Sequence, residues 1–270
     1  MAAAGAAILA AGVKEVSPPE RHLSAIGLQL YSVREEMKRD FEGSLQKVAD
    51  IGYAEIEFAG FFGRSPQQVR DMLDRIGLRA PSAHIGFDDL SKSLSAVLDT
   101  GHTIGLEYIV CPATDANLRR TLDDCKRLAE TFNKFGAGSR AANIHFAYHN
   151  HDVDFAPVGE TSLYEVLLAE TDPELVKFEM DLYWVVMANR HPLDYFARFP
   201  GRFPMVHVKD MDGTSSRGQI ELGRGIINFK EIFQHSEQAG IQHYFVEHEN
   251  LAAPWPSMRA NYEYLKNLRF

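Results

Sequence analysis

Four side chains that could bind a metal ion lie near the ends of successive apolar segments in the second half of the sequence. They are His149, Asp181, His207 and Glu247. Two imidazoles and two carboxylates form a mixed nitrogen and oxygen ligand set, which suits Mn²⁺, Co²⁺, Zn²⁺ or Fe²⁺ better than Mg²⁺. Each residue could instead satisfy a polar neighbour inside a buried core, but four at equivalent positions favour one bound divalent ion. Such an ion would polarise a substrate carbonyl.

Four residues at or beside this set are candidates for proton transfer. Glu247 or His149 is the candidate base, and His151 or Lys209 is the candidate acid. His151 either orients a ligand, donates a proton or is an ordinary loop histidine. Lys209 either stabilises a developing enolate oxygen or pairs with a neighbouring carboxylate. The two candidates for that carboxylate are Asp210 and Glu249.

Four further residues are candidates for substrate contacts. Glu57 and His84 lie at inward-facing strand ends, where they either bind substrate hydroxyls or form a buried polar network. Trp184 either forms an apolar wall against a sugar ring or packs under a loop. Arg224 lies in a glycine-flanked loop, where it either binds an anionic group or is an exposed surface arginine.

Short apolar segments alternate with helix-period segments from Ile26 onward, which is the pattern of a parallel sheet covered by helices. Eight such units without a Pro/Ser-rich linker fit a closed barrel better than an open sheet. We therefore predict a single (β/α)8 barrel over residues 25–270. The predicted strands are Ile26–Tyr31, Ala54–Phe58, Ala80–His84, Glu107–Cys111, Asn143–His149, Leu175–Asp181, Pro204–Lys209 and His243–Glu249.

Side chains in the later predicted strands alternate between apolar and polar with a period of two. In residues 175–181, Val176, Phe178 and Met180 alternate with Glu179 and Asp181. The apolar set should face the helices, and the polar set should face the interior of the barrel. Because active sites of this fold lie at the C-terminal ends of the strands, we expect the polar residues at those ends to meet.

The composition is that of an ordinary globular protein, with 45% hydrophobic and 24% charged residues in a chain of 270. A formal net charge of −9 should repel a phosphate backbone, so we predict no nucleic-acid partner. The two cysteines, Cys111 and Cys125, cannot form a disulfide framework, and Cys125 is predicted to pack in the core. A homo-oligomer is compatible with a barrel covered by helices.

The first thirteen residues, Met1–Val13, are almost entirely Ala, Gly, Ile and Leu. They resemble the remnant of an export signal, which would place the protein in the periplasm, and without such a signal it would be cytoplasmic. No basic stretch precedes the apolar run, and an alanine-rich terminus without a targeting role explains it equally well. The run is too short to span a bilayer, so we predict no membrane span. Residues 1–24 are therefore predicted to form a tail outside the barrel.

The chain contains seven short motifs, in this order: LQLYSVR (Leu28–Arg34), IEFAG (Ile56–Gly60), YHNH (Tyr148–His151), EMDLYW (Glu179–Trp184), HVKD (His207–Asp210), LGRG (Leu222–Gly225) and VEHE (Val246–Glu249). As a set they resemble the xylose isomerase-like sugar phosphate isomerase/epimerase superfamily, which includes inosose dehydratase and hydroxypyruvate isomerase-like members. The resemblance covers nearly everything after Gly27. It implies a metal-dependent barrel that acts on a small sugar, with the family's metal ligands at Asp181, His207 and Glu247.

The sequence departs from this family on the fifth predicted strand. The family usually has a glutamate there that is both metal ligand and catalytic base, whereas this chain has His149. A neutral imidazole can still coordinate the ion. Epimerases of the family use two opposed glutamates, and only Glu247 remains of that pair. Dehydration, elimination or hydration of a keto-sugar is therefore an alternative to epimerisation.

We expect a divalent-metal-dependent isomerase or epimerase of a small keto-sugar, which removes the proton next to a carbonyl held by the ion and passes through an enediolate. The main alternative is a lyase, dehydratase or hydratase acting on a keto-sugar or keto-glycoside. A nuclease related to endonuclease IV would need more histidine and carboxylate ligands, and a non-catalytic sugar-binding barrel is the third alternative. The absence of GxGxxG after the first strand, GxxxxGK[ST] and GxSxG disfavours dinucleotide, P-loop and serine-hydrolase functions.

Overall fold

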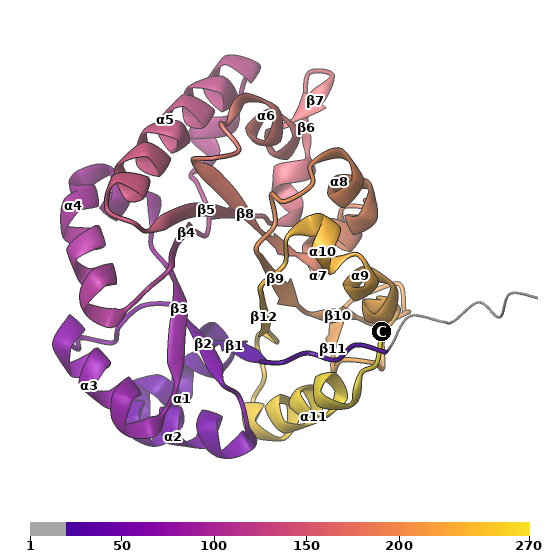
Figure 1. Cartoon of the computed structure of the whole chain (residues 1–270). Coiled ribbons are helices and arrows are strands. Elements are labelled where there is room, and N and C mark those ends of the chain that lie inside the picture. The colour runs from indigo at the N-terminus through magenta and orange to yellow at the C-terminus, as the bar shows by residue number, and fades with distance from the viewer. Residues whose placement is uncertain (1–19) are drawn as a thin grey trace, which may run out of the picture.

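Eight parallel strands close into a barrel in the computed structural model of the chain, which describes residues 20–270 (Figure 1). Each strand overlaps one predicted segment, so the predicted (β/α)8 barrel is confirmed. The apolar stretch interpreted as an export-signal remnant lies outside the described residues. In order around the barrel, the strands are β1 (Gly27–Gln29), β12 (His243–Val246), β9 (Met205–Val208), β8 (Val176–Asp181), β5 (His145–His149), β4 (Tyr108–Cys111), β3 (Arg79–His84) and β2 (Glu55–Phe58).

Helices surround the barrel and connect its strands (Figure 1). The limits of α3 (Pro66–Ile76) follow from its sequence, because the side chain of Ser65 caps its first turn and Pro66 takes the first helical position. Gly77 ends α3 in the left-handed conformation, with φ 82°, which glycine adopts without strain. The other helices are α1 (Arg34–Arg39), α2 (Phe41–Ile51), α4 (Phe87–Ile104), α5 (Leu122–Ala141), α6 (Leu163–Glu170), α7 (Leu182–Met187), α8 (Pro192–Arg198), α9 (Phe229–Gln234), α10 (Ser236–Ala239) and α11 (Pro254–Asn267).

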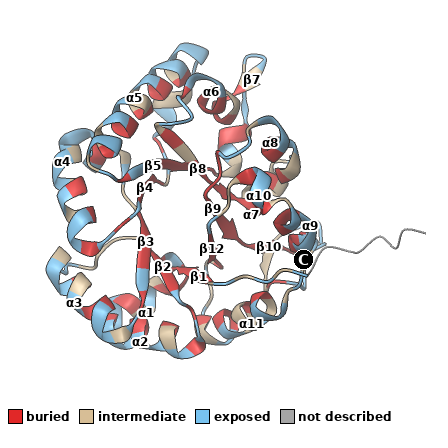
Figure 2. Cartoon of the chain, viewed as in Figure 1, coloured by how far each residue is buried: buried red, intermediate tan, exposed pale blue. Residues whose placement is uncertain are grey.

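The helices bury the side that faces the barrel, and their outer side is exposed (Figure 2). On α5, the ring centroid of Phe132 lies 5.2 Å from those of both Phe146 and Tyr148 on β5. The opposite face of β5 points into the barrel, where Ala147 belongs to a separate inner apolar cluster. The predicted period-two alternation is therefore confirmed for this strand. The other members of the inner cluster are Tyr108, Val110, Met205 and Phe245.

Short elements shape the loops that follow the strands. Asp210, just after β9, is buried and accepts hydrogen bonds from the backbone N–H groups of Gly223 at 2.9 Å, Gly225 at 3.0 Å and Ile227 at 3.2 Å. One carboxylate thus holds the glycine-rich loop in place. The short elements are the 3-10 helices η1 (Leu30–Val33), η2 (Ala116–Arg119) and η3 (Asp152–Phe155), the hairpin of β6 (Pro157–Val158) and β7 (Thr161–Ser162), and the hairpin of β10 (Asp210–Met211) and β11 (Gln219–Ile220).

Both cysteines are buried and neither forms a disulfide, which confirms the predicted core position of Cys125. Burial raises the pKa of the Cys111 thiol to about 12, so this side chain stays protonated near neutral pH. Within residues 20–270, no helix combines the length and apolar character that crossing a membrane requires.

Candidate active site

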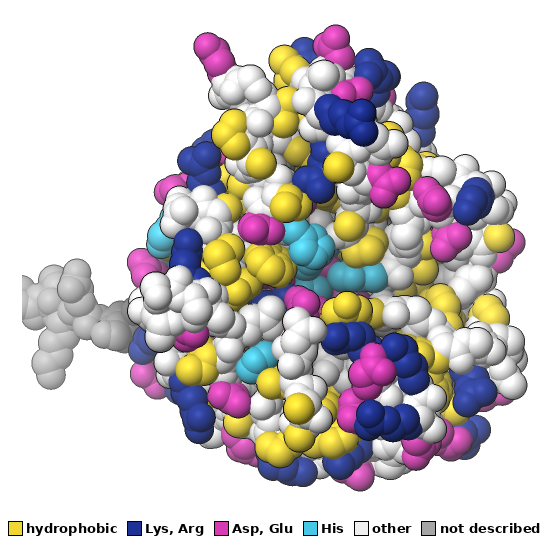
Figure 3. Space-filling view, turned by 180° about the vertical axis from the view of Figure 1, so that it is seen from behind, with side chains coloured by type: hydrophobic (Ala, Val, Ile, Leu, Met, Phe, Trp, Pro, Cys, Tyr) yellow, Lys and Arg dark blue, Asp and Glu magenta, His cyan; other side chains and the backbone are white. Residues whose placement is uncertain are grey.

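A pocket of about 890 Å³ opens at the C-terminal ends of the strands. Its wall includes His84, His149, His151, Glu247 and Glu249. Figure 3 shows histidine side chains gathered near the middle of one face of the molecule. Three of the predicted histidines and one predicted carboxylate therefore face a cavity large enough for a small molecule.

The strand register places the predicted metal ligands at different levels of the barrel. His149 on β5 pairs with Glu179 on β8, whereas Asp181, two residues later on β8, pairs with His207 on β9. Glu247 lies two residues beyond the β12 partner of His207. Because neighbouring strands are staggered in a closed barrel, the four residues divide between two groups.

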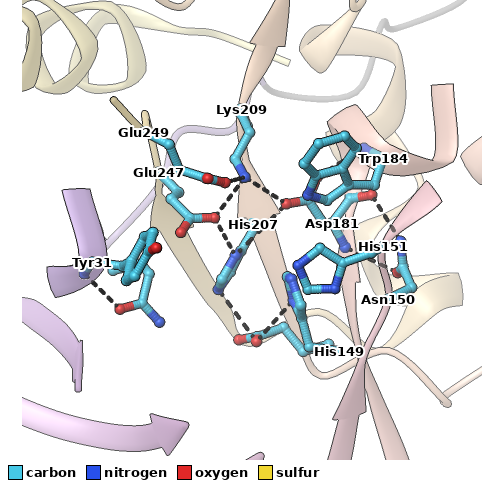
Figure 4. A network of polar contacts seen from close by, with 12 residues as sticks. Tyr31, His149, Asn150, His151, Asp181, Trp184, His207, Lys209, Glu247 and Glu249 are labelled. Atoms are coloured by element: carbon cyan, nitrogen blue, oxygen red, sulfur yellow. Dashed lines mark hydrogen bonds and ion pairs between the residues drawn. The ribbon is translucent and has the colours of Figure 1, made fainter. Parts of the chain in front are cut away.

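The first group, which we call the carboxylate side, consists of Asp181, Glu247 and the Nδ1 edge of His207. Nδ1 lies 3.0 Å from Glu247 Oε2 and 3.8 Å from Asp181 Oδ2 (Figure 4). Each residue offers one possible ligand atom, and these atoms lie within 4.8 Å of one another. The structure thus brings together three of the four predicted ligands.

The second group, which we call the histidine side, consists of His84, His149, Glu179 and the Nε2 edge of the same His207. Glu179 Oε2 lies 2.7 Å from His84 Nε2, 3.3 Å from His149 Nδ1 and 3.2 Å from His207 Nε2. One ligand atom from each residue again lies within 4.8 Å of the others. The fourth predicted ligand, His149, therefore belongs to the opposite side of His207 from Asp181 and Glu247.

The ammonium group of Lys209 lies on the carboxylate side (Figure 4). Nζ is 2.7 Å from Glu247 Oε2, 2.7 Å from Glu249 Oε1 and 3.1 Å from Asp181 Oδ2. The side chain is only 1% exposed. Of the two carboxylates expected beside Lys209, Glu249 makes the contact, while Asp210 binds the glycine-rich loop instead.

Asp181 is held from two directions at the end of β8. Its Oδ1 accepts a hydrogen bond from the backbone N–H of Trp184 at 2.9 Å, which caps α7. The side chain of Asn150 donates to the Asp181 carbonyl at 3.4 Å and accepts from the Asp181 N–H at 3.1 Å. These contacts leave Oδ2 free to contact Lys209.

Glu57 is fully buried and supports two of the imidazoles. Its Oε1 accepts a hydrogen bond from Gln29 Nε2 at 2.6 Å and lies 2.7 Å from His207 Nε2 and 3.1 Å from His84 Nε2. Its Oε2 accepts a hydrogen bond from the Ser82 hydroxyl. Glu57, a predicted substrate contact, is not part of the pocket wall. Its contacts are those of a residue that positions His84 and His207.

The charge states of the two sides differ. Burial, together with neighbouring cationic groups, lowers the pKa of His149 well below its ordinary value, so its imidazole is neutral. Burial would lower the pKa of His84, but nearby carboxylates raise it to about 9. Burial would likewise raise the pKa of Glu247, but the charges of Lys209 and His207 hold it far below its usual range. A neutral imidazole is a good metal ligand, and a carboxylate held ionised in this way is a weak base.

The remaining predicted residues differ in their distance from the cluster of polar side chains that the carboxylate side and the histidine side form together. His151 is half-buried, lines the pocket and has its ring centroid 4.9 Å from that of His149. Trp184 lies beside it, with ring centroids 5.8 Å apart, and is 5.3 Å from Lys209 Nζ. Arg224 is exposed and is not part of the pocket wall, and its Nη1 lies 3.6 Å from Glu221 Oε2. The structure brings His151 and Trp184 to the cluster, but not Arg224.

Several buried polar atoms of the cluster have no hydrogen-bond partner among the described residues. They include Glu179 Oε1, and also His149 Nδ1 and Asp181 Oδ2, which lie 3.3 Å from Glu179 Oε2 and 3.1 Å from Lys209 Nζ without forming a hydrogen bond. A buried polar atom without a partner is costly, and a divalent ion would supply the missing interaction. The donor set of imidazoles and carboxylates therefore fits such an ion.

Three residues of the cluster are absent from the sequence-based set of site residues. Glu179 has a signal, because it shares its predicted strand face with Asp181, but only one metal ligand is predicted from each strand. Glu249 is expected only as a partner of Lys209, whereas it also lines the pocket. Gln29 has no recognisable signal, because its contact with Glu57 depends on the pairing of β1 with β2.

A (β/α)8 barrel with imidazoles and carboxylates gathered at the C-terminal ends of its strands is typical of metal-binding barrel enzymes. The family model described as xylose isomerase-like TIM barrel matches residues 45–268. The chain therefore belongs to the xylose isomerase-like TIM barrel family, and the resemblance indicated by the seven motifs is confirmed.

Similar proteins carry sugar-related names. An inosose dehydratase of Lacticaseibacillus casei is 22% identical over 242 residues, covering 76% of this chain and 80% of the relative. A sugar phosphate isomerase/epimerase from Parabacteroides distasonis has a solved structure with a TM-score of 0.80 and 27% identity, covering 90% of this chain and 98% of that chain. The IolI protein, solved with a zinc atom, shares the fold with a TM-score of 0.70 at 10% identity, covering 89% of this chain and 96% of that one.

Proposed function

We propose that this chain is a divalent-metal-dependent enzyme that removes the proton next to the carbonyl of a small keto-sugar. One observation carries the proposal: imidazoles and carboxylates from separate strands converge on His207 beside a pocket of about 890 Å³. The names of the similar proteins, inosose dehydratase and sugar phosphate isomerase/epimerase, support a sugar substrate.

The ion would be held by residues around His207, drawn from the predicted set of His149, Asp181, His207 and Glu247 together with Glu179. When bound, it supplies Lewis-acid chemistry that makes the C–H next to a substrate carbonyl more acidic. The mixture of imidazoles and carboxylates favours manganese, cobalt, zinc or iron over magnesium. The protein's own contribution is to orient these ligands and to move the proton.

His151 is the residue best placed to move the proton. It lines the pocket, and within residues 20–270 it forms no ion pair. Burial lowers its pKa, although Asp154 opposes this effect, so the imidazole is neutral and able to accept a proton. Glu247 is less suited to this task, because the charges of Lys209 and His207 lower its pKa and so make its carboxylate a weak base. We therefore assign proton transfer to His151 and ligand orientation to Glu247.

Lys209 contributes by positioning the carboxylates. Its ammonium is almost completely buried and is shared by three carboxylates, so its charge is directed at the protein and away from the pocket. The surrounding carboxylates raise the pKa of Lys209 although burial opposes this, so the side chain stays charged and is a poor proton donor. Its presence keeps Asp181 and Glu247 oriented toward His207.

A single proton carrier fits an elimination or a transfer on one face of the sugar better than an epimerisation by two opposed carboxylates. In either reaction His151 takes the proton from carbon. If it passes this proton to a departing β-hydroxyl group, water is released. If it returns the proton to the former carbonyl carbon while the proton of the adjacent hydroxyl moves to the former carbonyl oxygen, the sugar is isomerised. The inosose dehydratase relatives favour the loss of water, and the Parabacteroides distasonis protein favours isomerisation as the second candidate.

NMR of a panel of keto-sugars with the metal-loaded enzyme in D2O tests the proposal. Deuterium uptake next to the carbonyl reports proton removal, and the mass of the product separates loss of water from isomerisation. His151→Gln should slow the exchange about 100-fold or more, and Glu247→Gln should abolish turnover by releasing His207 and Lys209. His102→Gln, at an exposed position on α4, should leave the rate unchanged. No exchange with any keto-sugar contradicts the function, and a full rate in His151→Gln contradicts the assignment of the base.

A further inference from the structure

His207 separates two places where a divalent ion could lie. The carboxylate side offers Asp181 and Glu247 to its Nδ1, and the histidine side offers two more imidazoles and Glu179 to its Nε2. The resemblance to the family points to the carboxylate side, because the family's ligands fall on Asp181, His207 and Glu247. The ammonium of Lys209, which lies on that side, favours the opposite choice.

The carboxylate side already contains a fixed cation. Lys209 Nζ contacts Asp181 Oδ2 at 3.1 Å and Glu247 Oε2 at 2.7 Å, which are the same oxygens that lie beside His207 Nδ1. Since metal–oxygen bonds are about 2.0–2.2 Å long, an ion bonded to both oxygens would lie close to the ammonium and be repelled by it. The rings of Tyr183 and Trp184 lie 5.8 and 5.3 Å from Nζ and help to enclose it.

The histidine side has the composition and spacing of a metal site. Three imidazole nitrogens lie 2.7–3.3 Å from Glu179 Oε2, and separations of about 3 Å are those of two ligands that each bind one ion at about 2.1 Å. Glu179 Oε1 is buried there without a hydrogen-bond partner among the described residues, and His149 Nδ1 has only its 3.3 Å contact with Glu179 Oε2, which is not a hydrogen bond. The ion-pair partners of Glu179 and Glu57 within residues 20–270 are all histidines, so no lysine or arginine neutralises these two carboxylates.

We propose that the divalent ion lies on the histidine side, held by His84, His149, Glu179 and His207, while Lys209 takes the place of a cation on the carboxylate side. This inference rests on the proposed function for the presence of an ion, and it adds the position and the ligands. Three imidazoles and one carboxylate favour Zn²⁺, Fe²⁺, Co²⁺ or Mn²⁺ over Mg²⁺ and Ca²⁺. Because His84 and His149 line the pocket, an ion here would be open to a substrate.

X-ray absorption spectroscopy of the zinc-loaded wild-type protein tests the position without any substitution, because it counts imidazole ligands. The histidine side supplies three imidazoles, whereas the carboxylate side alone supplies only that of His207. The set predicted from the sequence would supply two, from His149 and His207. A fit with three imidazoles supports the inference, and a fit with one or two overturns it.

Substitutions that nearly preserve side-chain size test the position of the ion through the affinity for Zn²⁺. Glu179→Gln and His84→Gln should weaken Zn²⁺ binding by at least about tenfold, as measured by competition with a chromophoric chelator. Asp181→Asn and Glu247→Gln are the matched controls and should weaken it far less. The reverse ranking overturns the inference. Circular dichroism verifies that each variant is folded. Where a variant does not fold, the X-ray absorption spectrum of the wild-type protein decides the position of the ion.

The deuterium-exchange assay separates failure of this inference from failure of the proposed function. Exchange by an enzyme that holds zinc through Asp181 and Glu247 would support the function and overturn the position. Zinc held by three imidazoles without exchange on any keto-sugar would support the position and refute the function. A wild-type protein that retains no zinc in elemental analysis overturns the inference whatever the exchange result.

Discussion

Replacing Lys209 with methionine isolates the contribution of the buried ammonium. The substitution keeps an unbranched side chain of similar length but removes the charge that lies 2.7 Å from Glu247 and Glu249 and 3.1 Å from Asp181. Three carboxylates are then left facing one another in an enclosed part of the barrel. We expect the variant to fold with a large loss of stability.

The distances set the size of that loss. At an effective dielectric constant of about 20, each of the three contacts corresponds to about 5–6 kcal/mol of attraction before desolvation and the repulsion between carboxylates are counted. Those opposing effects cancel most of the sum, and removing one partner of a buried ion pair typically costs about 3–5 kcal/mol. For a domain of this size, 1 kcal/mol changes Tm by about 2–4 °C. Lys209→Met should therefore lower Tm by about 6–20 °C.

The pH dependence of the loss follows from Glu247. In the wild type, Lys209 and His207 hold its pKa below the ordinary value in spite of burial, so this group adds stability above the ordinary pKa that is lost as the pH falls through the folded-state pKa. Without Lys209, burial favours a raised pKa, and a raised pKa gives stability that is lost as the pH rises. The difference in stability between wild type and variant should therefore be larger at about pH 8 than at about pH 5.

Thermal unfolding in the presence of EDTA measures this difference without a contribution from bound ions. Glu249→Gln is the matched control, because its side chain is 20% exposed and only one of the three contacts is lost, so it should cost about 1 kcal/mol or less. The double variant Lys209→Met/Glu247→Gln should lose less stability than the sum of the single variants, since removing a carboxylate relieves repulsion. A change in Tm below about 2 °C for Lys209→Met, or an equal change at both pH values, refutes this reasoning.

Three further predictions concern the ion, the glycine-rich loop and a buried tyrosine. Zinc at about 100 times its Kd should stabilise the EDTA-treated protein by about 2.7 kcal/mol in calorimetry, and an unchanged Tm would contradict the metal site. Gly225→Ala should lower stability to urea by about 2 kcal/mol because the added methyl group would collide with the Met211 carbonyl oxygen and with Asp210, whereas Gly86→Ala, which has open space around it, should not; equal midpoints would contradict this. Tyr148→Phe removes the 2.9 Å hydrogen bond to buried Asp154 and should cost about 1–2 kcal/mol in the same assay, so a midpoint equal to that of the wild type would show that this bond contributes no net stability.

The succession of short apolar segments and helix-period segments predicts all eight strands, because every strand must bury apolar side chains against the helices whatever the details of the loops. It predicts their ends less well. The fifth strand begins at His145, two residues later than predicted, because Asn143 has a left-handed backbone with φ 55°. The last strand ends at Val246, since the N–H groups of His248 and Glu249 bind side chains of other segments and not a neighbouring strand. Alternation contains no information on either effect.

Most of the ionisable residues of the candidate site could be predicted from the sequence, but their division into two sides of His207 could not. Residue types at strand ends identify His149, Asp181, His207 and Glu247, because ionisable groups inside a barrel need polar or charged partners. The level of each side chain depends on the stagger between strands, which a single sequence does not reveal. That stagger pairs His149 with Glu179 and Asp181 with His207, so one expected group of four becomes two groups that share His207.

His149 and Lys209 together determine how negative charge is distributed in the cluster. A glutamate at position 149, as in most members of the family, would face Glu179 at the same level of the barrel and add a sixth negative charge. The imidazole supplies a ligand atom without that charge. On the other side of His207, Lys209 forms ion pairs with Asp181 and Glu247 and offsets one negative charge. Under the proposed metal position, the neutral imidazole and the buried ammonium would both favour a divalent ion on the side of His207 where imidazoles predominate. The five carboxylates of the cluster are Glu57, Glu179, Asp181, Glu247 and Glu249.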